Sequence, residues 1–245
     1  ETVRPAETDS ARRADRMVKK VLLVLTSVDQ FPDGQPTGWY LPEAAHPYWK
    51  FAEAGLEVIW ASITGAATCD PGSVDASKSD AESMKFWDSK DLKAATETTM
   101  RLADVDPKDF DAVFFAGGFG TMWDFPEDPD AIRVIQDMYA AGKVVAAVCH
   151  GPIVFLNAKS PDGEPLLKGK ECTGFTNAEE NAVGKYEVVS KPSGPGSCED
   201  MLGAIGIFKD GGVFQPNVCI AGNLMTGQNP PSAGPLAEEV VMALA

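Results

Sequence analysis

The chain has 245 residues, of which 44% are hydrophobic, and its formal net charge is -15. This length gives enough apolar surface for one sizeable core and predicts a single α/β domain over residues 18–245, preceded by a flexible polar segment over 1–17. The acidic balance disfavours nucleic acid and anionic membranes as partners, and no apolar run reaches the ~20 residues of a membrane-spanning helix.

Strand-like and helix-like segments alternate along the chain. Apolar runs of strand length predict strands over residues 21–26, 56–62, 110–116 and 144–148. Helical spacing or polar helical composition predicts helices over residues 42–54, 79–103, 129–141 and 231–244. This order indicates βαβ units and a mostly parallel sheet, and so a flavodoxin-like three-layer sandwich.

The segment between the fourth strand and the last helix is patterned less regularly. Its predicted elements are a short strand over 171–175, a short helix over 177–183 and hairpin-like strands over 213–222. A turn-rich insertion over 161–169 and a Ser-, Gly- and Pro-rich loop over 190–197 are expected to shape access to the site.

The most informative segment is the strand 144–148 followed by Cys149, His150, Gly151 and Pro152. Gly and Pro suit the first turn of a helix, so the cysteine is expected in a tight turn between strand and helix. In open α/β sheets ligands bind at the carboxyl ends of the strands, where a helix amino terminus stabilises negative charge. The sequence therefore predicts a nucleophile elbow that favours a thiolate.

The cysteines and histidines limit the other possibilities. The cysteines are Cys69, Cys149, Cys172, Cys198 and Cys219, and the histidines are His46 and His150. An odd number of cysteines without a CxxC pair argues against a disulfide framework and a zinc site, so a reducing, cytoplasmic location is expected. The sequence also has no phosphate loop or dinucleotide fingerprint, so neither a metal nor another cofactor is expected.

Several motifs occur in the order typical of one family. Residues 147–152, Ala-Val-Cys-His-Gly-Pro, resemble the nucleophile elbow of the ThiJ/PfpI superfamily, which has the class I glutamine amidotransferase-like fold. Further similar motifs lie at residues 37–47, 117–126, 169–176 and 226–230, so the resemblance covers most of the chain. The chain is most similar to the heat-shock-type branch of glutathione-independent glyoxalases, which also act as chaperones.

The resemblance implies roles for individual side chains. Cys149 would be the nucleophile, and Glu43 would be the acid that touches it and moves a proton. His150 would be a general base or acid, oriented by Glu180, although the adjacent Glu179 leaves this register uncertain by one.

The glycine-rich turn after the third long strand would present backbone N–H groups to an oxyanion, together with the amide of His150. Its implied oxyanion- and substrate-binding residues are Gly118, Phe119 and Gly120. Close relatives usually carry His where this chain has Phe119, which removes one proton carrier or substrate hydrogen bond and makes the pocket more apolar. His46 and the Gln228–Asn229 turn are interpreted as structural or as substrate contacts, with neither reading favoured.

The implied activity is a cofactor-free glyoxalase reaction. Cys149 would add to the aldehyde carbon of methylglyoxal or a similar 2-oxoaldehyde, and the resulting thioester would be hydrolysed to a 2-hydroxy acid such as lactate. One alternative is a stress-response chaperone or redox sensor in which Cys149 is oxidised. Another is a different cysteine-dependent hydrolase or hydratase on the same scaffold. The resemblance also implies a homodimer.

Overall fold

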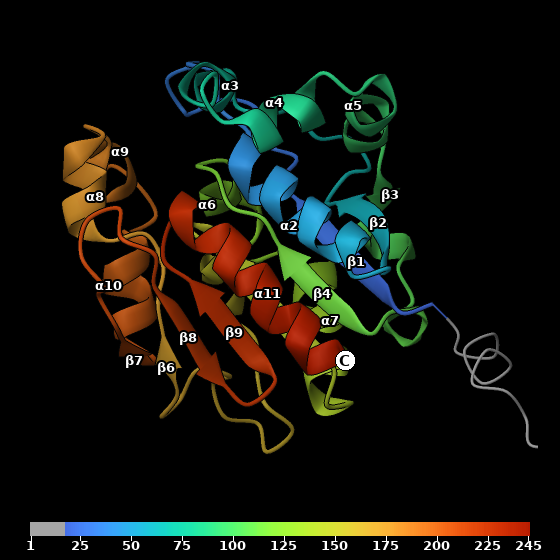
Figure 1. The fold of residues 1–245 in the computed structure, drawn as a ribbon. Coiled ribbons are helices and arrows are strands. Elements are labelled where there is room, and N and C mark those ends of the chain that lie inside the picture. The colour runs from blue at the N-terminus through green and yellow to red at the C-terminus, as the bar shows by residue number, and fades with distance from the viewer. Residues whose placement is uncertain (1–17) are drawn as a thin grey trace, which may run out of the picture.

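The computed structural model describes residues 18–245 (Figure 1), and the predicted flexible segment 1–17 lies outside the described residues. The strands of the main sheet are β1 (Lys20–Leu25), β2 (Glu57–Ser62), β3 (Met100–Arg101), β4 (Ala112–Phe115), β5 (Val144–Val148), β8 (Val218–Ala221) and β9 (Leu224–Gly227). Their order is β3-β2-β1-β4-β5-β9-β8, and every neighbouring pair is parallel except the β8-β9 hairpin. The predicted mostly parallel α/β sheet is therefore confirmed.

Helices and a small second sheet complete the described part of the chain. The α-helices are α2 (Leu41–Glu53), α3 (Pro71–Ala76), α4 (Ala81–Trp87), α5 (Lys90–Glu97), α6 (Thr121–Asp124), α7 (Pro129–Ala140), α8 (Asn177–Ala182), α9 (Tyr186–Val189), α10 (Cys198–Gly203) and α11 (Ala233–Leu244). The 3-10 helices are η1 (Leu102–Asp104), η2 (Pro107–Asp109), η3 (Gly151–Phe155) and η4 (Pro230–Ser232). Two short strands, β6 (Glu171–Cys172) and β7 (Ile207–Phe208), pair with each other.

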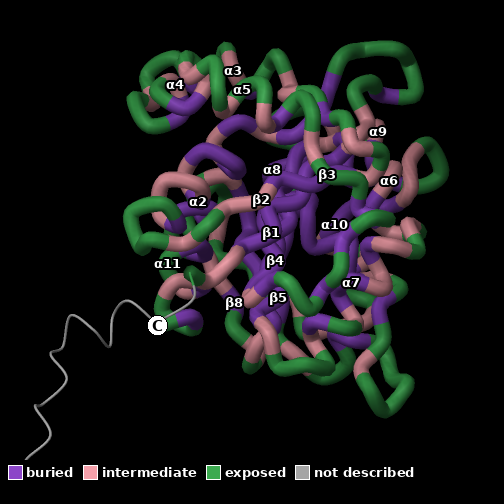
Figure 2. The backbone as a smooth tube through the Cα atoms, turned by 90° about the vertical axis from the view of Figure 1, so that its right-hand side faces the viewer, coloured by how far each residue is buried: buried purple, intermediate pink, exposed green. Residues whose placement is uncertain are grey.

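Helices cover both faces of the main sheet. Figure 1 shows α2 and α11 side by side in front of it and α7 behind it. Alternate side chains of β1 divide between the two layers: Val21, Leu23 and Leu25 join the apolar cluster of α2 and α11, whereas Leu22 and Val24 join the cluster of α7. The sheet between these layers is the buried centre of the molecule (Figure 2). The predicted three-layer sandwich is confirmed.

The prediction of one helix over 79–103 is wrong in its extent. Two shorter helices occur there, α4 and α5, because Asp80 and Ser89 cap separate helix starts with their side chains. The chain then forms the edge strand β3 and η1. Helix α3, which follows the capping residue Asp70, has no counterpart in the predictions.

The boundaries of several other elements also differ from the predicted ones. The hairpin predicted over 213–222 lies at 218–227, because Gly222, with φ 69°, forms its turn instead of ending it. The strand predicted over 171–175 ends at Cys172, where the backbone turns toward β9. The helices predicted over 129–141, 177–183 and 231–244 are present within a few residues, the last one beginning as η4.

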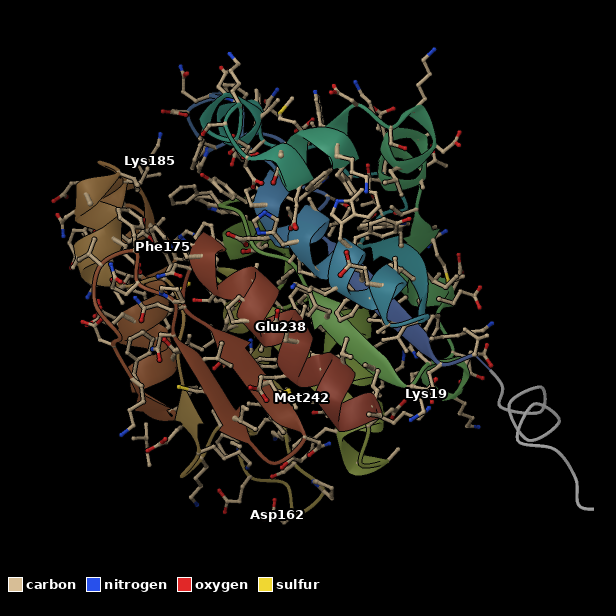
Figure 3. The ribbon with its side chains drawn as sticks, in the orientation of Figure 1. Lys19, Asp162, Phe175, Lys185, Glu238 and Met242 are labelled. Atoms are coloured by element: carbon tan, nitrogen blue, oxygen red, sulfur yellow. The ribbon has the colours of Figure 1, made fainter. Side chains whose placement is uncertain are left out.

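The turn-rich insertion 161–169 lies far from the elbow. Figure 3 shows Asp162 at the bottom of the molecule, well below Phe175, which packs beside the elbow. The insertion is held there by a bridge between Lys159 and Pro165 and by the Lys159 N–H, which donates to Gln136 Oε1 of α7. The expectation that this insertion shapes access to the site is therefore not supported.

Membrane insertion has no candidate segment in this part of the fold. No helix within residues 18–245 is long and apolar enough to cross a bilayer.

The packing of the central sheet gives a stability prediction. Phe114 of β4 is fully buried and contacts the ring of Phe51 of α2 at a centroid distance of 5.8 Å. We expect Phe114→Ala to lower the free energy of unfolding by about 3–5 kcal/mol, because it leaves a cavity in the core. Met242→Ala is the control, since this side chain of α11 is 60% exposed (Figure 3). Urea unfolding of both variants measures the difference, and equal midpoints would contradict the assignment of the core.

Candidate active site

Cys149 lies directly after β5 in a left-handed backbone conformation. Its φ is 63°, which residues other than glycine rarely adopt. Its N–H donates to the carbonyl of Gly227 (2.9 Å), and its carbonyl accepts from the N–H of Phe175 (2.9 Å). A side chain at Gly151 would approach the carbonyl oxygen of Phe115 to 2.8 Å, so the turn requires glycine there. These contacts form the predicted elbow, although the helix after it is the five-residue η3 and not an α-helix.

A hydrogen-bonded chain leads from the cysteine to a buried acid. Cys149 Sγ lies 3.3 Å from His150 Nδ1, and His150 Nε2 lies 2.7 Å from Glu180 Oε1. The cysteine and histidine are nearly inaccessible and Glu180 is fully buried. This resolves the register geometrically, since Glu180 contacts the imidazole whereas Glu179 hydrogen-bonds to other groups.

Glu43 reaches the elbow from the first turn of α2. Its Oε2 accepts from the N–H of Gly117 (2.8 Å), and its Oε1 has no hydrogen-bond partner within residues 18–245. A side chain at Gly117 would collide with both Glu43 Oε2 and Cys149 Cβ, so the acid and the cysteine both lie against the position that a Cβ atom would take there. Complete burial raises the pKa of Glu43 from 4.5 to about 8, and the nearby Cys149 thiol and the Gly117 N–H oppose that shift.

The expectation of a resting thiolate is wrong. Burial raises the pKa of the Cys149 thiol well above its usual range, and the neighbouring Glu43 raises it further. The resting cysteine is therefore a neutral thiol that must lose its proton when it reacts, and His150 Nδ1 is placed to accept that proton.

The glycine turn after β4 lies against the elbow. Gly118 has φ 110°, and a side chain there would collide with the backbone of Gly38 and Trp39. Within residues 18–245, neither the N–H of Gly118 nor the N–H of His150 has a hydrogen-bond partner, so both could bind an oxyanion. A side chain at Gly120 would collide with the carbonyl of Val28 and with Thr26, so this position also requires glycine.

Aromatic rings surround the imidazole of His150. Its centroid lies 4.4 Å from that of Phe119 and 4.6 Å from that of Phe175, which is labelled in Figure 3. Phe31 packs on Phe119 at 5.4 Å, and Lys185 Nζ lies 4.3 Å from the centroid of Phe31. Phe119 is thus at the site as predicted, in contact with the proposed base.

Sequence reasoning missed three of the groups near the elbow. Phe31 and Phe175 were not predicted as site residues, although Phe175 lies in one of the motifs that carry the resemblance. Tyr40 was also missed: its N–H donates to the carbonyl of Gly117, and burial, followed by the charges of Glu43 and Cys149, raises its phenol pKa to about 12. The signals in the sequence that could have identified these residues were the glycines near them and Pro42, which lies at the start of α2 close to Tyr40.

The remaining candidates have structural contacts. His46 Nε2 lies 2.7 Å from Asp80 Oδ2, the residue that caps α4, so this histidine joins two helices. Gln228 and Asn229 donate their side-chain N–H groups to Glu179 Oε1 at 3.1 and 2.8 Å. Within residues 18–245, no group of three or more His, Cys, Asp or Glu side chains is placed to hold a metal ion.

The chain is similar to known proteins over nearly its whole length. The family model described as DJ-1/PfpI matches residues 38–243. Glyoxalase 3 of Candida albicans is 36% identical over 231 residues, which cover 91% of this chain and 98% of that protein. A glutathione-independent glyoxalase of Saccharomyces cerevisiae is 34% identical over 92% of this chain and 98% of its own length. The crystal structure of glyoxalase III from Candida albicans matches with a TM-score of 0.84 at 34% identity, covering 92% of this chain and 97% of that one.

The raised pKa of Glu43 predicts a pH-dependent stability. Its carboxyl titrates near 4.5 when unfolded and near 8 when folded, so its contribution to stability is complete below pH 4.5 and is lost as the pH rises to about 8. When the pH rises from 5 to 8, we expect the free energy of unfolding of the wild-type protein to fall by on the order of 3 kcal/mol more than that of Glu43→Gln. Urea unfolding at both pH values measures this difference.

Glu53→Gln is the matched control, because Glu53 lies on the same helix and is exposed. This variant should follow the wild-type pH dependence. Parallel curves for the wild-type protein and Glu43→Gln would show that Glu43 does not hold a proton in the folded state.

Proposed function

The chain belongs to the DJ-1/PfpI family, and on that premise we propose that it is a glutathione-independent glyoxalase acting on methylglyoxal or similar 2-oxoaldehydes. The observation that carries the proposal is the placement of Cys149 between His150 and the buried, protonated Glu43. This arrangement offers a nucleophile, a base for its proton and a second proton carrier without any metal ligand set. The same activity is named for relatives that match almost the whole chain.

In the first step Cys149 adds to the aldehyde carbon. The thiol proton moves to His150 Nδ1, the carbon–sulfur bond forms and the carbonyl electron pair becomes an oxyanion. Glu180 stabilises the resulting imidazolium through Nε2, and the free N–H groups of Gly118 and His150 bind the oxygen. Return of the proton to that oxygen gives a hemithioacetal.

The second step moves hydrogen between the two carbons of the substrate. Glu43 has a pKa of about 8, so it can take up or release a proton near neutral pH, and its Oε1 has no hydrogen-bond partner within residues 18–245. Glu43 gives its proton to the ketone oxygen and takes the proton of the former aldehyde carbon, which yields an enediol. That proton then goes to the former ketone carbon while the hydroxyl group of the former aldehyde carbon gives its proton back to Glu43, and the product is a thioester of a 2-hydroxy acid. One carbon is oxidised as its neighbour is reduced, so no external redox agent is needed. Water then hydrolyses the thioester and restores the thiol.

The two alternatives are less well supported. A redox sensor needs an accessible thiol of low pKa, whereas Cys149 is buried and its pKa is raised. Another hydrolase or hydratase would use the same Cys149 and His150. It would leave unexplained a buried carboxyl group that titrates near neutral pH beside the nucleophile.

The state of assembly and the location of the protein are part of this proposal. A homodimer is supported by exposed apolar side chains on neighbouring C-terminal elements, namely Ile207, Val213 and Ile220. A cytoplasmic location is supported by the free cysteines, which form no disulfide within residues 18–245.

The decisive experiment is lactate production from methylglyoxal without glutathione. We expect Cys149→Ala to lower kcat/KM by at least about 10³-fold, because the covalent step is lost. Glu43→Gln should lower it by about 10²- to 10⁴-fold, because the amide cannot carry the proton between carbons. Cys219→Ala, a cysteine on the edge strand β8, is the control and should keep wild-type turnover.

Full turnover by Cys149→Ala would exclude the covalent mechanism. No turnover by the wild-type protein, with Cys149 still open to alkylation, would exclude this substrate class and favour the hydrolase or chaperone alternatives.

A further inference from the structure

One buried acid beside the site takes no part in the mechanism above. Glu179 is fully buried, and within residues 18–245 it forms no ion pair with a basic side chain. Isolated buried charge is costly, so this carboxylate requires several hydrogen-bond donors. It has five, contributed by three separate segments of the chain.

One oxygen of Glu179 fixes the start of helix α8. Oε2 accepts from the N–H and the hydroxyl of Thr176 at 2.9 and 3.0 Å, and the Thr176 hydroxyl accepts from the N–H of Glu179. This reciprocal capping box sets where the six-residue helix begins. Glu180 is the next residue, so the same contacts fix the direction in which the Glu180 side chain points from the helix toward His150.

The other oxygen holds a strained turn. Oε1 accepts from the N–H of Phe214 (2.8 Å) and from the side chains of Gln228 and Asn229. Phe214 has φ 52°, an unfavourable conformation for a bulky residue. Its ring centroid lies 6.2 Å from that of Phe175, whose ring contacts His150.

Both supports of the imidazole therefore depend on one carboxylate. Helix α8 carries the acid that hydrogen-bonds to His150, and the Phe214 turn supports the aromatic ring beside it. We propose that Glu179 is a positioning residue that holds Glu180 and the Phe175–Phe214 wall in register with His150. The kinetic part of this inference rests on the proposed glyoxalase function, whereas the geometric part does not.

The substitution Glu179→Gln tests this dependence with almost no change in size. A carboxylate accepts at both oxygens, whereas an amide presents one oxygen and one NH₂ group. In either orientation the NH₂ group would face donors, either those of Thr176 or those of Phe214, Gln228 and Asn229. The variant must therefore release helix α8 or the turn.

The direct readout is the NMR signal of the His150 imidazole. The chain has only two histidines, so His46 serves as an internal reference. We expect the Nε2–H resonance of His150, which reports the 2.7 Å contact with Glu180, to shift or broaden in Glu179→Gln. It should stay unchanged in Glu187→Gln, whose carboxyl group is exposed on α9. This measurement needs no substrate.

Kinetics provide the second readout. We expect Glu179→Gln to lower kcat by about 10- to 100-fold with little change in KM, and to move the pH profile of kcat/KM as Glu180→Gln does. The part of the effect that Glu179 exerts through Glu180 is already lost in Glu180→Gln, so the double variant should lose less kcat than the product of the two single losses. Gln228→Ala is the second variant in case Glu179→Gln does not fold. It removes one of the five donors to Glu179, together with the hydrogen bonds of Gln228 to Gly211, Gly212 and Asn217, and it should move the same signal less.

The outcomes separate the two proposals. Absence of lactate from the wild-type protein contradicts the proposed function, and the imidazole signal still tests Glu179. Unchanged signals in Glu179→Gln and Gln228→Ala, or additive losses of kcat in the double variant, would overturn the positioning role.

Discussion

The left-handed backbone at Cys149 is the constraint on which the site depends. It is held by β9 through Gly227 and by the segment before α8 through Phe175, and it needs the absence of a side chain at Gly151. Because the chain reverses within this turn, the sulfur meets His150 from its own segment and Glu43 from α2. The parallel sheet thus brings together groups more than 100 residues apart.

Three buried acids surround this turn, and each avoids an uncompensated charge differently. Glu43 holds a proton, Glu180 pairs with His150, and Glu179 accepts five neutral hydrogen bonds. In the proposed mechanism these solutions correspond to three tasks: proton transfer, orientation of the base and support of the surrounding elements. The burial that raises the pKa of Cys149 also raises the pKa of Glu43 to about 8, which suits the proton transfer proposed for it.

Apolar strand runs and glycine turns are local signals, so the sequence predicted the mostly parallel sheet and the tight turn that carries Cys149 after the strand 144–148. Properties that depend on tertiary packing could not be predicted from the sequence. The choice between Glu179 and Glu180 depends on which side of a six-residue helix faces His150, and the thiol's pKa depends on burial by distant segments. The break in the helix predicted over 79–103 could have been predicted from Asp80 and Ser89. Both residue types favour the capping position of a helix over its interior.

The complete burial of Glu43 has an isotopic consequence. A carboxyl group sealed from water exchanges its hydrogen slowly with the surroundings. In the proposed mechanism, the hydrogen that Glu43 takes from one substrate carbon would then be returned to the neighbouring carbon more often than it is lost to water. When the reaction is run in heavy water, the second carbon of the hydroxy acid should therefore carry mostly the hydrogen that came from the aldehyde carbon, and little deuterium.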